Sequence, residues 1–223
     1  MREVILDTET TGLDPAAGHR IVEIAGLELI NHLPTGRTYQ QYLNPERDMP
    51  ADSFAIHGLS AEFLADKPLF GDIVDQFLGF IADSQLIIHN AEFDLKFLNA
   101  ELAKAERPGL PPERATDTVL IARQKFPGSP ASLDALCRRF AIDNSARAKH
   151  GALLDTELLA EVYLELIGGR QAGLELVSGR RKAPELTVVQ RQIRPPRPHA
   201  PTEAELAAHA ALLTRLKNPV WPQ

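Results

Sequence analysis

The chain has 223 residues, of which 44% are hydrophobic and 24% are charged. This balance excludes a wholly disordered chain, and the length allows one domain of ordinary size with a tail, or two small domains. The formal net charge is -6, so contact with nucleic acid would need bound cations or a local basic patch.

The single cysteine, Cys137, excludes an internal disulfide and a four-cysteine zinc site. It lies in an apolar segment, where core packing is the expected role and a nucleophile is the alternative. The sequence contains neither a run of about 18 apolar residues nor a signal-peptide pattern. We therefore expect a cytoplasmic protein.

The first predicted element is a buried strand that begins with Val4 and runs into Asp7-Thr8-Glu9, with Gly12 ending the segment. Side chains alternate along a strand, so Asp7 and Glu9 project from the same face. Two neighbouring carboxylates repel each other, and burial favours a cation between them. Alone, however, this pattern is more typical of a solvated strand end, so a metal site needs further ligands.

The next elements are predicted from apolar periodicity, caps and breakers. Residues 20–30 and 38–43 are expected to join the first strand in an antiparallel meander. A further short strand is predicted over residues 85–89. Helices are predicted over residues 60–65 with Ser60 as N-cap, 69–82, from the 89–94 segment to about 104, 119–125, 132–140 and 152–167. This order indicates an α/β domain with a mixed sheet.

Four acidic residues stand where a predicted strand ends or a helix begins: Asp7, Glu9, Asp94 and Asp155. In α/β sheets functional side chains gather at the carboxyl ends of the strands, and a carboxylate cluster selects Mg²⁺ or Mn²⁺ over zinc. His150 precedes Asp155 by five positions, so it can reach the same site only from the loop before the helix. Asp117 also begins a helix, but capping is its expected role and metal binding the alternative.

Three segments resemble, in order, the three motifs of the DEDDh 3′–5′ exonuclease superfamily: residues 7–12 (DTETTG), 89–94 (HNAEFD) and 150–155 (HGALLD). Residues 54–59, 115–118 and 125–128 are also similar to the proofreading (epsilon) subunits of bacterial DNA polymerase III. The resemblance covers the first 167 residues and implies a ribonuclease H-like fold, with a mixed sheet flanked by helices.

The resemblance also implies roles for single residues. Asp7, Glu9, Asp94 and Asp155 would hold two divalent cations, Mg²⁺ or Mn²⁺, and His150 would act as general base in the release of 5′-mononucleotides from DNA 3′ ends. The 3′-terminal nucleotide would be contacted by Thr10, Gly12, Leu13, Asp52, His57 and Phe93. For Phe93, core packing is the alternative.

The composition changes after residue 167, and residues 168–201 are predicted to be a flexible, basic, proline-containing linker. Within it, residues 171–176, from Gln171 to Leu176, resemble the sliding-clamp-binding peptide of the epsilon subunits. Residues 202–205 have the form of a capping box and predict a helix to about Lys217. The segment 202–223, which contains Trp221, resembles the part of the epsilon subunits that anchors them to the polymerase alpha subunit.

Two other functions are consistent with parts of the chain. An RNA-trimming DEDDh exonuclease of the ribonuclease T or oligoribonuclease type would share the motifs, but the tail argues against it. A non-catalytic scaffold between clamp and polymerase would explain the tail. The complete set of mutually repelling carboxylates argues against that second alternative.

Overall fold

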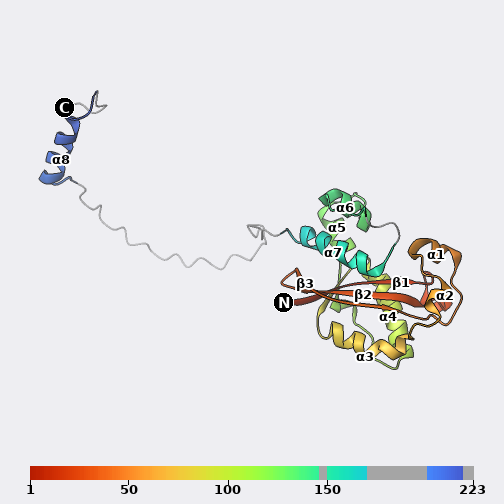
Figure 1. Ribbon diagram of the computed structural model, residues 1–223. Coiled ribbons are helices and arrows are strands. Elements are labelled where there is room, and N and C mark those ends of the chain that lie inside the picture. Colours follow the sequence, from red (N-terminus) through yellow and green to blue (C-terminus); the bar gives the residue numbers. More distant parts are fainter. Residues whose placement is uncertain (146–149, 170–199, 218–223) are drawn as a thin grey trace, which may run out of the picture. The chain divides into compact units, whose positions relative to one another are not determined.

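The computed structural model describes residues 1–145, 150–169 and 200–217 (Figure 1). The chain divides into two units, Met1–Leu174 and Glu175–Gln223, and the sheet lies in the first. Within the described part of the chain, no helix combines the length and the apolar character needed to cross a membrane.

A five-stranded mixed sheet, in the order β3-β2-β1-β4-β5, forms the centre of the first unit (Figure 1). The predicted meander is confirmed, because β2 pairs antiparallel with both β1 and β3. The strands β4 and β5 continue the sheet parallel to β1. The bounds are β1 Arg2–Thr10, β2 Ile21–Ile30, β3 Leu33–Tyr42, β4 Gln85–Ile88 and β5 Ala115–Asp117.

The alternation of β1 separates two hydrophobic clusters, one on each face of the sheet (Figure 1). Val4 and Leu6 pack with α3 (Phe70–Ile81) and α4 (Ala91–Lys104). Ile5 belongs to the opposite cluster, with residues of α5 (Thr118–Lys125), α6 (Leu133–Phe140) and α7 (Ala152–Leu166). The odd-numbered positions of β1 therefore face α7.

Cys137 is fully buried in the cluster that contains α7, which confirms its predicted core position. An apolar stripe also runs along α7, since Leu158, Val162 and Leu166 are buried there and the partly buried Leu154 packs against the same cluster. The stripe holds α7 against β1 and β2 and so fixes the height of the helix over the sheet.

Side-chain caps set the beginning of several helices, as predicted for Ser60 and Asp117. Ser60 accepts from the Phe63 amide at 3.1 Å at the start of α2 (Ala61–Leu64), and Ser132 accepts from the Ala135 amide at 3.3 Å. Asp117 accepts from the Val119 amide at 2.8 Å, which confirms its capping role.

Two elements were not among those predicted, the helix α1 (Ala51–His57) and the strand β5. The helix has seven residues and follows Pro50, which supplies no side-chain cap, so it lacks the usual start signal. The strand has only three residues and is recognisable by its pairing with β4 rather than by any local pattern. Two 3-10 turns complete this unit, at Pro15–Ala17 and Pro112–Arg114.

The second unit contains the helix α8 (Glu203–Leu213). Its predicted capping box is confirmed: the Thr202 hydroxyl accepts from the Glu205 amide at 3.3 Å, and the Glu205 carboxylate accepts from the Thr202 amide at 2.8 Å. The predicted clamp-binding peptide at 171–176, most of the predicted linker and Trp221 lie outside the described residues.

Candidate active site

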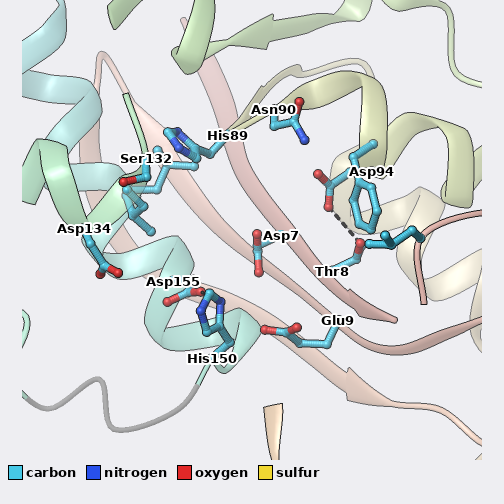
Figure 2. Close-up of a pocket in the computed structure, with 14 residues that line it drawn as sticks. Asp7, Thr8, Glu9, His89, Asn90, Asp94, Ser132, Asp134, His150 and Asp155 are labelled. Atoms are coloured by element: carbon cyan, nitrogen blue, oxygen red, sulfur yellow. Dashed lines mark hydrogen bonds and ion pairs between the residues drawn. The ribbon is translucent and has the colours of Figure 1, made fainter. Parts of the chain in front are cut away.

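A cleft of about 420 Å³ opens at the carboxyl ends of β1 and β4 (Figure 2). The five side chains predicted to carry the chemistry all line it: Asp7, Glu9, Asp94, His150 and Asp155. They are separated by up to 148 positions along the sequence, and the fold brings them together from one strand, two helices and a loop. In Figure 2, Asp7 lies centrally between Asp94, Asp155 and Glu9.

The sheet and the two helix starts explain this convergence. Asp7 and Glu9 continue the face of β1 that is directed at α7, and Asp155 lies in the first turn of that helix. Asp94 lies in the first turn of α4, which follows β4 after only two residues. Negative side chains are favoured in the first turn of a helix because of its dipole, so both helices stabilise a carboxylate that they present to the cleft.

Asp7 has the most strongly perturbed environment in the cleft. Burial raises its pKa well above the ordinary value, and the nearby carboxylates of Asp94, Glu9 and Asp155 raise it further. A group of this kind is stable as an anion only if positive charge is supplied. The electrostatics of the described residues therefore fit a bound cation.

Asp94 is 3% exposed, and this burial raises its pKa to about 7. The rise is opposed by the Thr8 hydroxyl, which donates a hydrogen bond of 2.7 Å to Asp94 Oδ1 (Figure 2). Thr8 faces α4 because it alternates with Asp7 and Glu9 along β1. One strand thus provides two carboxylates on one face and, on the other, a hydroxyl that positions a third.

His150 lies in the loop immediately before α7, as the spacing required. Its Nδ1 is 3.6 Å from Asp155 Oδ2, and its backbone amide donates to the Ile56 carbonyl at 3.1 Å. The latter bond ties the loop to α1. One ligand atom each from Glu9, His150 and Asp155 lies within 4.8 Å of the others, so the donor geometry fits a divalent cation with two carboxylates and an imidazole at its edge.

Of the six residues predicted to contact substrate, two line the cleft. Leu13 is 82% exposed at its rim, and Phe93 is half-buried. The Phe93 ring also packs on Phe97, with centroids 5.1 Å apart, so it combines a core contact with a place in the cleft. A large exposed apolar side chain such as Leu13 is suited to packing against a base.

The other four, Thr10, Gly12, Asp52 and His57, do not line the cleft. The Thr10 hydroxyl donates to the Gly12 carbonyl at 2.7 Å. Any side chain at Gly12 would collide with the His19 ring. Asp52 is exposed on α1, while His57 is buried there and its Nδ1 accepts from the Leu59 amide at 3.0 Å. Their substrate roles remain predictions.

The cleft also contains residues to which the sequence assigned no role. They are Thr8, His89, Asn90, Ser132, Leu133, Asp134 and Leu159. His89 Nδ1 lies 2.9 Å from the Thr118 hydroxyl, and Asp134 Oδ1 accepts from the side-chain Nδ2 of Asn144 at 3.1 Å. Thr8 and His89 lie inside the quoted motifs, whereas Asp134 had only the signal of an acidic residue in a capped first turn.

Known proteins share both the sequence and the fold. Residues 4–163 match the family model described as Exonuclease. The DNA polymerase III subunit epsilon of Rickettsia felis is 61% identical over 180 residues, which cover 79% of this chain and 79% of that protein. Its counterpart from Rickettsia conorii is 52% identical over 231 residues and covers 97% of this chain and 96% of that protein. The structure of exonuclease X in complex with 5′ overhanging duplex DNA superimposes with a TM-score of 0.58 at 26% identity, covering 74% of this chain and 90% of that chain.

Proposed function

The chain belongs to the exonuclease family and, within it, to the epsilon subunits of bacterial DNA polymerase III, and we propose that Asp7, Glu9, Asp94, Asp155 and His150 form its 3′–5′ exonuclease centre. The observation that supports this assignment is the convergence of four carboxylates and a histidine in one cleft. Structural roles alone do not account for carboxylates placed where they raise the pKa of the buried Asp7.

The exonuclease family depends on divalent metal ions, and we propose that the four carboxylates hold two of them, Mg²⁺ or Mn²⁺. Oxygen ligands without cysteine suit these hard cations. Such ions would stabilise the charge that develops on the attacking and leaving oxygens of the phosphodiester. The carboxylates of Asp94, Glu9 and Asp155 all act on Asp7, so Asp7 is well placed to share both ions.

His150 is proposed as the general base. Its ring is about half exposed at the mouth of the cleft, where it can accept a proton from a water approaching the 3′-terminal phosphodiester. Asp155, 3.6 Å away, stabilises the imidazolium that results. The P–O3′ bond then breaks, so that the terminal residue leaves as a 5′-mononucleotide and the shortened strand ends in a 3′-hydroxyl.

The proposed substrate is the 3′ end of DNA, frayed or single-stranded. Leu13 and Phe93 offer apolar surface, which packs against any base without reading its identity. Selection for mispaired ends would come from the lower cost of unstacking them. Thr10, Gly12, Asp52 and His57 are retained as proposed contacts near the terminal nucleotide.

The named relatives are subunits of a polymerase, and we propose the same association for this chain, in the cytoplasm. The domain organisation would be an exonuclease domain over residues 1–167, a linker over 168–201 and a polymerase-binding segment over 202–223. Gln171 to Leu176 would bind the sliding clamp. A linker with two attachment points would raise the local concentration of the nuclease at the primer end.

The assignment is tested with Asp7→Asn and His150→Gln, compared with Asp83→Asn, which changes an exposed carboxylate elsewhere. Digestion of single-stranded DNA with Mg²⁺ is expected to fall by roughly 10³-fold or more in the first two variants and to stay unchanged in the third. Mn²⁺ binding, measured by calorimetry, should weaken in Asp7→Asn and be nearly unchanged in His150→Gln. Full activity in Asp7→Asn would reject the centre, and lost Mn²⁺ affinity in His150→Gln would make His150 a ligand. An RNA oligonucleotide digested faster than matched DNA would favour the RNA-trimming function.

A further inference from the structure

Glu23, on β2, is a buried carboxylate directed at the active-site helix but absent from the cleft lining. It is 2% exposed. In the antiparallel register of β1 and β2 it stands opposite Glu9, so the two side chains lie on the same face of the sheet. Like charges directly opposite each other on neighbouring strands destabilise a sheet. A compensating interaction is therefore needed to explain why a buried glutamate occupies this position opposite Glu9.

That interaction is at the N-terminus of α7. Glu23 Oε2 accepts a hydrogen bond of 3.2 Å from the backbone amide of Ala152, the first residue of the helix. The residue before it, Gly151, has no side chain with which to cap the helix. The first amides of a helix have no partner within the helix, and a buried one without an acceptor is costly. Glu23 thus caps α7 from a neighbouring strand, 129 positions away in sequence.

The rest of the carboxylate is held in place by β3. Gln40 Nε2 donates to Glu23 Oε1 at 2.7 Å, and the Tyr42 hydroxyl also interacts with the carboxylate. Because both of its oxygens accept hydrogen bonds, the Glu23 carboxylate is held in one orientation on the sheet. The helix start that it holds carries Asp155 three residues later and follows His150 by two.

We infer that Glu23 is a positioning residue for the exonuclease centre, which sets the start of α7 so that Asp155 and His150 meet Asp7 and Glu9. This inference rests on the proposed function of those residues. Glu23 would act through the Ala152 amide and would bind neither metal nor substrate. A misplacement of about 1 Å in a catalytic group can lower turnover roughly 100-fold, so the effect of losing this bond should exceed its effect on stability.

The test uses the full chain with Glu23→Ala, Glu23→Asp and Glu23→Gln. Alanine removes the acceptor, aspartate keeps the charge but shortens the reach, and glutamine keeps an oxygen that can accept from Ala152. The matched control is Glu3→Ala. Glu3 is also buried on the sheet, at 1% exposure, and contacts the other end of α7 by accepting from the Tyr163 hydroxyl at 2.8 Å.

Two properties are measured: hydrogen–deuterium exchange of the amides of residues 152–155 in metal-free protein, and Mn²⁺ affinity by calorimetry. Glu23→Ala and Glu23→Asp are expected to accelerate that exchange and to weaken Mn²⁺ binding roughly tenfold, while Glu23→Gln stays within about threefold of the wild type. Glu3→Ala should change neither, even where it lowers the unfolding temperature. If Glu23→Ala does not fold, Glu23→Asp decides by the same criteria.

The inference is overturned if Glu23→Asp matches the wild type in both measurements, or if Glu3→Ala reproduces its losses. A defect in Glu23→Gln as large as that in Glu23→Ala would also overturn it, because the charge rather than the hydrogen bond would then matter. Digestion of DNA by the wild-type protein tests the proposed function separately. The exchange measurement needs no metal, so it still decides the role of Glu23 if that digestion fails.

Discussion

The ionisation of single carboxyl groups in the centre depends on how deeply each group is buried. Asp7 and Asp94 are both disfavoured as anions by burial. In the absence of cations, this cost lowers the free energy of unfolding at the pH where these two carboxyl groups must be ionised to bind metal. Catalytic sites often contain such locally unfavourable groups, and the rest of the fold offsets their cost.

The raised pKa of Asp94 predicts an unusual pH dependence of stability in chelator. Between the ordinary value of 3.8 and the folded value of about 7, the folded state binds a proton that the unfolded state does not. The free energy of unfolding should therefore rise as the pH falls, by about 2 kcal/mol between roughly pH 7 and pH 5.5. Urea denaturation with EDTA measures this difference, and Asp94→Asn should reduce it, while Asp7, whose pKa is also raised, accounts for the part that remains. An equally steep dependence in Asp94→Asn would assign the effect to other groups.

Thr8→Val tests the hydroxyl that opposes the rise in the pKa of Asp94. Without the 2.7 Å hydrogen bond, the pKa of Asp94 should increase further, so that less of it is ionised at neutral pH. Because a proton on Asp94 competes with the cation, turnover at subsaturating Mg²⁺ should fall by about tenfold near pH 7 and recover above pH 8.5. Thr116→Val, which changes a hydroxyl on β5 that accepts from Gln85, is the control and should leave the pH profile in place. If the turnover of Thr8→Val is reduced equally at every pH, the substitution acts through altered packing rather than through the pKa of Asp94.

Among the elements, those with local signals were predictable from the sequence. Ser60, Ser132 and Thr202 each cap the helix that was predicted to follow them. The motifs likewise identified the carboxylates that the fold brings together. Elements defined by distant partners were not predictable: β5 exists through its pairing with β4. Glu23 caps a helix whose first residue lies 129 positions away, and no local pattern indicates such a contact.

The ion pair of Arg20 and Glu101 connects β2 to α4 at the base of the loop that carries Leu13. Arg20 Nε and Nη2 donate to the Glu101 carboxylate at 2.6 and 2.8 Å, and Glu101 is 3% exposed. The Thr11 amide donates to the Arg20 carbonyl at 2.9 Å and the Arg20 amide donates to the Thr11 hydroxyl at 3.0 Å, so these two bonds close the same loop.

Arg20→Met should destabilise the protein by about 3 kcal/mol, because it removes the two close hydrogen bonds of a buried carboxylate and leaves only Lys104 Nζ, 4.0 Å away, as a cation. The double variant Arg20→Met with Glu101→Met should lose clearly less than Arg20→Met alone, since no uncompensated charge remains. Urea denaturation at neutral pH measures both. Equal losses in the single and double variants would show that the pair contributes through packing.

At the scale of the whole molecule, the two hydrophobic clusters of the nuclease domain are built from its own chain segment. Among the described residues, all members of these clusters lie between Val4 and Leu166. Removal of residues 202–223 should therefore leave the unfolding temperature and the digestion of single-stranded DNA unchanged, while co-purification with the polymerase alpha subunit is lost. The full-length chain is the control. A truncated protein that still co-purifies would place the docking surface within residues 1–201.

The burial of Cys137 has a practical consequence for experiments on the intact assembly. It is the chain's single cysteine and its side chain is 0% exposed. A maleimide dye added to the folded protein would therefore find no accessible thiol. A cysteine introduced near α8 would become a unique attachment point, so fluorescence could follow the tail as it meets its partner without first replacing a native residue.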